Sequence, residues 1–97
     1  MARILVAEDD PSVRAFVVSA LTMKGHEVVA EEDGGLAAET ADAEQGRFDL
    51  LLSDIKMPIM DGIALALDVA AKYPKIDDAL AGKPVEVVSL GRQAREQ

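Results

Sequence analysis

Short apolar runs alternate along the chain with segments in which apolar residues recur every three or four positions. The runs are typical of strands buried on both faces of a sheet, and the segments between them are typical of helices. The strands are expected at 3–7, 26–30 and 50–52, and the helices from Pro11 to Gly25, at 36–44 and at 62–73. This order predicts an α/β fold with a doubly wound parallel sheet, in one domain covering residues 1–97.

Two of the expected helices have a clear apolar side. Pro11 suits the first helical position with Asp10 as N-cap, and Pro74 ends the last helix. The apolar positions of the first helix are Val13, Phe16, Val17, Ala20 and Leu21, and those of the helix at 62–73 are Ile63, Ala66, Ala70 and Tyr73. Each set forms one helical face, the side on which an amphipathic helix packs against a core.

Acidic residues follow two of the predicted strands. Glu8, Asp9 and Asp10 come directly after the first strand, and Asp54 comes shortly after the apolar run Leu50–Leu52. Ligands of such sheets gather at the carboxyl ends of the strands, where a doubly wound sheet places its first and third strands side by side. We therefore expect Glu8 and Asp9 to face Asp54 across one cleft.

Each acidic group also has a simpler interpretation. Asp54 taken alone is an ordinary cap of the turn after its strand, and the acidic run at 8–10 taken alone is a solvated, helix-capping cluster. Their expected convergence favours a shared site, because close carboxylates raise one another's pKa unless a cation joins them. Mg²⁺ prefers such oxygen ligands, and beside it one carboxylate could attack a phosphoryl group and form an acyl phosphate.

Charge and composition exclude several classes of function. With 18 acidic and 10 basic residues the net charge is −8, and no Lys/Arg cluster offers a surface for a nucleic-acid backbone. The absence of cysteine excludes disulfides, thiolate chemistry and thiolate-bound metals. The sequence has neither a signal-peptide pattern nor an apolar run of membrane-spanning length, so we expect a cytoplasmic protein with no nucleic-acid or membrane partner.

Several short motifs together resemble the receiver domains of two-component response regulators. The most specific is the run D-x-x-M-P-x-M-D-G from Asp54 to Gly62. The other matching pieces are Ile4 to Asp10, Arg14, Gly25 to Val28, Asp33-Gly34 and Phe48 to Leu50. The opening, from Met1 to Phe16, is similar to single-domain cell-cycle regulators of the CpdR type.

The resemblance implies a flavodoxin-like receiver fold and a role for each matching residue. It implies that Asp54 is the phosphoacceptor and that Glu8 and Asp9 hold Mg²⁺ together with it. The backbone carbonyl of Lys56 is implied as a further metal ligand. The residues implied to shape the loop are Met57, Pro58 and Gly62, with Asp61 as the cap of the next helix.

The resemblance also implies partners. A histidine kinase or a histidine phosphotransfer protein would supply the phosphoryl group from a phosphohistidine. The chain itself would not be an enzyme, because its output would be contact with a downstream protein. In a CpdR-type regulator this contact would control a proteolytic machine, which makes a protease-associated factor the implied target.

The chain departs from the receiver pattern after its third predicted helix. Receivers continue with a fourth strand ending in Thr or Ser, a fourth helix and a fifth strand ending in Lys-Pro, whereas only residues 76–97 remain here. In the favoured interpretation Ala79–Gly82 is a remnant of the fifth strand, Lys83 contacts the phosphoryl group, and Val85–Gln97 is the last helix. The fold is then shortened to about four strands, without the usual switch hydroxyl.

Two other interpretations of this segment remain open. Val85–Ser89 could be the fourth strand with Ser89 as the switch hydroxyl, but Glu86 would then be buried in a strand at a high cost unless paired. Alternatively residues 77–97 are a divergent tail, and Lys83 is an exposed lysine. The favoured interpretation leaves the edge of strand 50–52 open or fills it with Ala79–Gly82. An open apolar edge would favour homodimers or segment-swapped oligomers.

Competing functions differ from the receiver in identifiable features. A receiver-like scaffold that cannot be phosphorylated would lack Mg²⁺-dependent modification and act by interaction alone. A phosphohydrolase with an aspartyl phosphate intermediate resembles D-x-D-x-T at its nucleophile, but Lys56 and Pro58 occupy the positions of the second acid and the hydroxyl. A dinucleotide-binding domain would need G-x-G-x-x-G after the first strand, and the sequence has none there.

Overall fold

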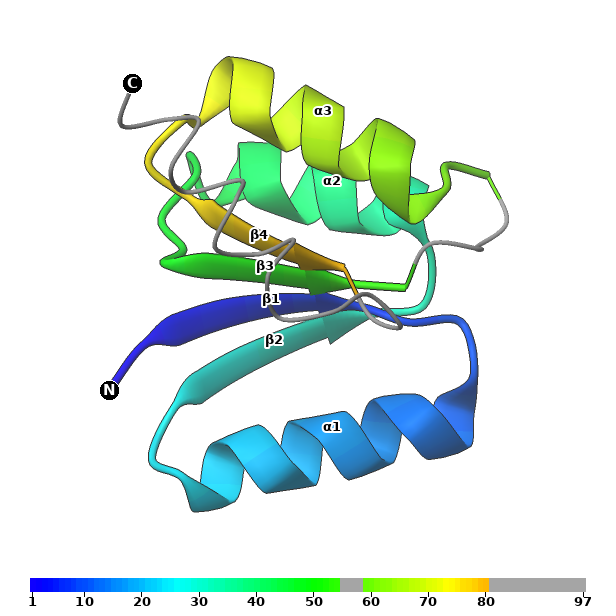
Figure 1. Cartoon of the computed structure of the whole chain (residues 1–97), viewed down its shortest axis with the longest axis vertical. Coiled ribbons are helices and arrows are strands. Elements are labelled where there is room, and N and C mark those ends of the chain that lie inside the picture. Colours follow the sequence, from blue (N-terminus) through cyan, green and yellow to red (C-terminus); the bar gives the residue numbers. More distant parts are fainter. Residues whose placement is uncertain (55–58, 81–97) are drawn as a thin grey trace.

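Four parallel strands form one sheet with helices on both faces (Figure 1). The computed structural model describes residues 1–54 and 59–80. In chain order the elements are β1 (Arg3–Ala7), α1 (Pro11–Met23), β2 (Glu27–Glu31), α2 (Gly34–Ala43), β3 (Leu50–Ser53), α3 (Gly62–Lys72) and β4 (Asp77–Leu80). Five residues with predicted roles lie outside the described residues: Lys56, Met57, Pro58, Lys83 and Ser89.

The strand order β2-β1-β3-β4 confirms the predicted doubly wound sheet. β1 lies between β2 and β3, and all three strand pairs are parallel. All four strands therefore point the same way, and their carboxyl ends meet at one edge (Figure 1). The helices that connect them lie on the two faces, as the alternating order of elements requires.

The last described strand begins earlier than predicted. A strand was expected at 79–82, whereas β4 spans Asp77–Leu80 and pairs with β3 from Leu50↔Asp77 to Ser53↔Leu80. Ile76, which is 1 % exposed, enters the core just before it, and pairing with β3 sets where the strand starts. The edge of β3 is therefore covered by β4 along its whole length, and the open edge considered above is absent.

The main core lies between the sheet and the pair α2 and α3. These two helices pack against each other on one face, while α1 lies on the opposite face over β1 and β2 (Figure 1). The core cluster contains Leu5, Ala7, Ala37, Ala38, Ala41, Phe48, Leu51, Leu65, Val69 and Ile76. The small buried alanines of α2 let this helix pack closely against β1.

The predicted apolar face of α3, which consisted of Ile63, Ala66, Ala70 and Tyr73, lies at the margin of the core. Ala66, Ala70 and Tyr73 are half-buried, and Tyr73 packs against the core cluster. The structure instead buries Leu65 and Val69, at 0 % and 1 % exposure, and leaves Ile63 48 % exposed. Most of this helix is apolar, so two stripes satisfy the helical spacing. The stripe that faces α2 and the sheet is the one that becomes core.

The predicted apolar face of α1 is only partly covered. No residue of α1 is buried, Phe16 is 74 % exposed, and only Val17 and Leu21 of the predicted face are half-buried. Among the described residues α1 is the one helix on its face of the sheet, and it lies over β1 and β2. Within residues 1–54 and 59–80, no second helix lies beside it to cover its flanks.

Candidate functional site

The ends of β1 and β3 place two acidic residues side by side. Ala7 and Ser53 are register partners, so Glu8 and Asp54 are the next residues on adjacent strands. The amide of Asp54 donates to the carbonyl of Ala7 at 3.0 Å, and the amide of Glu8 donates to the carbonyl of Glu31 at 3.0 Å. The sheet therefore holds the backbone of both acidic residues one step beyond the assigned strands.

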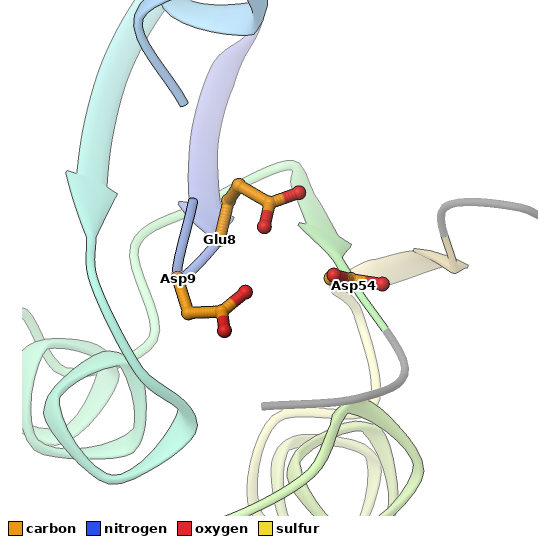
Figure 2. A group of neighbouring side chains, drawn as sticks. All are labelled: Glu8, Asp9 and Asp54. Carbon is orange, nitrogen blue, oxygen red and sulfur yellow. The ribbon is translucent and has the colours of Figure 1, made fainter. Parts of the chain in front are cut away.

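Three carboxylates converge at this edge (Figure 2). One carboxylate oxygen from each of Glu8, Asp9 and Asp54 lies within 4.8 Å of the others. Glu8 is buried, Asp54 is half-buried and Asp9 is exposed, so the cluster runs from the sheet toward solvent. The structure thus brings together the three acidic residues that the sequence singled out, while their roles as ligands and acceptor stay predictions.

Glu8 is the most perturbed member of the cluster. Its side chain is 7 % exposed, and it lines an apolar pocket together with Val13 and Val17 of α1. Burial is the main cause that raises its pKa, and a hydrogen bond with Asp9 and the charges of Asp54 and Asp9 add to the effect. A hydrogen bond from the amide of Asp10, at 3.1 Å, acts in the opposite direction.

Two other acidic residues serve as helix caps. Asp10 accepts hydrogen bonds from the amides of Ser12 and Val13 at 2.8 and 3.1 Å, which confirms the predicted N-cap of α1. Asp61 accepts one from the amide of Ala64 at 2.8 Å and caps α3, also as predicted. The helix-capping interpretation of the first acidic run therefore applies to Asp10, and not to the residues that face Asp54.

The backbone of Met60, just before α3, lies very close to a glycine at the start of α2. The Ser53 hydroxyl donates to the backbone carbonyl of Asp54 at 2.9 Å. A Cβ on Gly34 would lie 1.9 Å from the carbonyl oxygen of Met60, so only glycine fits at the start of α2. Gly62 is buried at the start of α3. Sequence reasoning named Gly62 as a loop-shaping residue and missed Gly34, whose only signal was the Asp33-Gly34 match.

Arg14 also touches the site. Its Nη1 donates to the backbone carbonyl of Glu8 at 2.9 Å. Sequence reasoning noted Arg14 as a matching residue without a role, because a contact between a helix side chain and a backbone carbonyl leaves no periodic signal.

The donor set fits a hard divalent cation. All three side chains offer carboxylate oxygens, the ligands that Mg²⁺ prefers. Burial is the main cause of the raised pKa of Glu8, and the negative charges of Asp54 and Asp9 add to it, so these charges oppose one another. A cation among them would remove this conflict. No described helix is both long enough and apolar enough to cross a bilayer.

Comparison with known proteins identifies the family. The family model described as "Response regulator receiver domain" matches residues 4–81. The response regulator receiver protein CpdR of Brucella abortus (strain 2308) is 50 % identical over 66 residues, which cover 68 % of this chain and 53 % of that protein. The chain thus spans about half the length of this curated relative.

Solved structures agree with this match. The response regulator TrrA from Thermotoga maritima, in complex with Mg²⁺-BeF, is 27 % identical with a TM-score of 0.76, covering 94 % of this chain and 81 % of that chain. A chain from the complex of histidine kinase ThkA with TrrA is 28 % identical with a TM-score of 0.77, covering 94 % and 80 %. The chain belongs to the receiver domain family of two-component response regulators.

Proposed function

We propose that residues 1–97 form a single-domain receiver that binds Mg²⁺ and accepts a phosphoryl group on Asp54. The observation that carries this proposal is the convergence of Glu8, Asp9 and Asp54 within 4.8 Å at the carboxyl ends of two adjacent strands. The site is partly exposed, so a phosphoryl donor can reach it from solvent. Family membership supports the same chemistry.

Glu8, Asp9 and Asp54 would hold the Mg²⁺, together with the backbone carbonyl of Lys56, which lies outside the described residues. When bound, Mg²⁺ neutralises charge on phosphoryl oxygens and so lowers the repulsion between a carboxylate and a phosphoryl group. The related regulator TrrA was solved with Mg²⁺-BeF, which supports this choice of cation.

Asp54 would act as the nucleophile. One of its carboxylate oxygens attacks the phosphorus of a phosphohistidine, the new oxygen–phosphorus bond forms, and the phosphorus–nitrogen bond breaks. The imidazole nitrogen leaves with the electron pair, and Asp54 keeps the phosphoryl group as an acyl phosphate. The hydrogen bond from the Asp54 amide to Ala7 holds the backbone of the nucleophile in place. Lys83, which lies outside the described residues, is proposed to contact the phosphoryl group as a point charge.

The proposed partners follow from this chemistry. A histidine kinase or histidine phosphotransfer protein would donate the phosphoryl group, and the complex of ThkA with TrrA supports a kinase. The protein would act in the cytoplasm by contact with a downstream protein, without enzymatic output of its own. The implied resemblance to CpdR-type regulators makes a protease-associated factor the proposed target. Homodimers or segment-swapped oligomers stay predictions, and a monomeric sedimentation profile at high concentration would contradict them.

An intact-mass experiment tests this function. The protein is incubated with acetyl phosphate and Mg²⁺, beside Asp54→Asn, a chelator control and Glu32→Gln, which removes one exposed charge near the same edge. The proposal expects one phosphoryl group on the wild type and on Glu32→Gln, and none on Asp54→Asn or with chelator. Modification of Asp54→Asn would refute Asp54 as acceptor. Unmodified but folded wild type would favour the alternative function, a scaffold that acts by interaction alone.

A further inference from the structure

Arg14 connects the first helix to the acidic end of β1. Its guanidinium donates to the backbone carbonyl of Glu8 at 2.9 Å, and its own amide donates to the carbonyl of Asp10 at 2.8 Å. The side chain is half-buried, so this contact is shielded from part of the solvent. The amide bond is the first hydrogen bond of α1 itself, so it is the side chain of Arg14 that ties the helix to the end of β1 at Glu8.

Three hydrogen bonds together fix the orientation of Glu8. Its amide donates to the carbonyl of Glu31 at 3.0 Å, one carboxylate oxygen accepts from the amide of Asp10 at 3.1 Å, and its carbonyl accepts from Arg14. The first is an extension of the sheet and the second is internal to the turn. Arg14 supplies the bond that comes from the helix.

This bond matters because the turn carries two carboxylates that lie close to the carboxylate of Asp54. Asp54 is held on β3, and Glu8 and Asp9 stand within 4.8 Å of it on a turn that leaves the sheet. The charges of Asp54 and Asp9 both act on the Glu8 carboxylate, so the position of the turn decides how strongly the three groups interact. The helix that follows gives little apolar anchorage against a shift of this turn, since none of its residues is buried.

We propose that Arg14 is a positioning residue that holds the Glu8-Asp9 turn in the arrangement needed to bind Mg²⁺. The inference rests on the proposed function of the acidic site. Because the guanidinium bonds to the carbonyl of Glu8 and not to a carboxylate, its effect is on geometry more than on the charge of the ligands. Partners of this outer kind change metal affinity by about 10- to 100-fold when removed.

The test compares Arg14→Met with Arg47→Met. Both remove a guanidinium, but Arg47 is exposed and lies between α2 and β3, on the amino side of the strand that carries Asp54. Mg²⁺ affinity is followed by NMR titration, which also reports the fold. We expect affinity to fall about 10-fold or more in Arg14→Met and to stay unchanged in Arg47→Met. In acetyl phosphate assays the half-saturating Mg²⁺ concentration should rise while the maximal rate changes little.

Two further measurements distinguish an effect of Arg14 on the position of the turn from an effect of its charge. They also distinguish it from a site that binds no Mg²⁺ at all. The affinity loss should persist at high ionic strength, because salt screens a charge effect and leaves a geometric one. Amide hydrogen exchange without metal should speed up at Glu8 and Asp10 in Arg14→Met, but not at Leu5. If Arg14→Met does not fold, Arg14→Lys, which keeps the charge on a shorter donor, is expected to show a smaller loss of affinity.

Unchanged Mg²⁺ affinity in a folded Arg14 variant would overturn the proposal, as would a loss that disappears in high salt. A wild type that binds no Mg²⁺ would overturn the proposed function instead. In that case hydrogen exchange still decides the positioning role: equal rates at Glu8 in the wild type and Arg14→Met would refute it.

Discussion

Ala7 and Ser53 are register partners across β1 and β3, and this pairing sets Glu8 beside Asp54. Side chains alternate faces along a strand, so a slip of one residue between the strands would exchange the residues that face α1 with those that face α2 and α3. The apolar residues of both strands are largely buried, which makes such a slip costly. The packing of the core thus specifies the geometry of the acidic site.

The pKa of Glu8 predicts how the metal-free protein responds to pH. Its folded value is raised above the ordinary 4.5, so the folded state binds the proton more tightly than the unfolded state. This contribution to stability is complete below the unfolded pKa and is lost as pH rises through the folded pKa. Glu8→Gln cannot ionise, so this variant does not lose that contribution to stability as the pH rises. Without metal, Glu8→Gln should therefore be more stable than wild type near neutral pH, and the difference should shrink toward pH 4.

Thermal or urea unfolding of both proteins across this pH range gives the difference directly, and carboxylates that do not interact with Glu8 cancel between them. Saturating Mg²⁺ should reverse the order, because ligand at about 100 times its Kd adds about 2.7 kcal/mol to a protein that binds it. A difference that is independent of pH would contradict the raised pKa of Glu8.

The sheet and the acidic site could be predicted from sequence because each depends on a local signal and a topological rule. The apolar runs marked β1 and β3, and the rule that these strands are neighbours in a doubly wound sheet placed Glu8, Asp9 and Asp54 together. The position of β4 could not be predicted in the same way. Its first residues, Asp77 and Asp78, carry no apolar signal, and pairing with β3 determines its start.

The buried faces of the helices could be predicted less well than the sheet. In α3 the spacing of Ile63 and Ala66 is as helical as that of Leu65 and Val69, so periodicity alone does not choose between them. The choice is made by contacts with α2 and the sheet, which are distant in sequence. In α1 the face around Phe16 was identified correctly as apolar, but apolar spacing does not show whether anything covers it.

Two leucines of α3 test its observed orientation. Leu65 is 0 % exposed and Leu67 is 68 % exposed. Leu65→Ala should destabilise the protein by about 2–5 kcal/mol because it leaves a cavity in the core, whereas Leu67→Ala should change stability by no more than about 0.5 kcal/mol. Urea unfolding with a common m-value measures both. Equal losses would mean that α3 packs with another face inward.

Phe16 gives a similar test for α1. An aromatic residue in a core costs about 3–5 kcal/mol when truncated to alanine, but Phe16 is 74 % exposed. Phe16→Ala should therefore cost well under 1 kcal/mol, close to an ordinary surface substitution. A loss of several kcal/mol in urea unfolding would show that this side chain is buried in solution.

Adjacent glycines at the start of α2 test the link between packing and the site. In Gly34→Ala the new Cβ would lie 1.9 Å from the backbone oxygen of Met60, and a backbone atom cannot give way by a change of rotamer. In Gly35→Ala the nearest atom is Cγ2 of Ile59, 2.9 Å away on an exposed and adaptable side chain. The two variants make the same chemical change at neighbouring helical positions. Only in Gly34→Ala would the new Cβ collide with a backbone atom.

Gly34→Ala should therefore lose about 1–3 kcal/mol of stability, the usual cost of overpacking. Gly35→Ala should change little or gain a few tenths of a kcal/mol from the better helix propensity of alanine. If the loop after Asp54 is part of the working site, Mg²⁺-dependent modification at a temperature where both are folded should slow in Gly34→Ala alone. Equal modification rates would separate the loop from the chemistry, and equal stabilities would contradict the close contact between Gly34 and Met60.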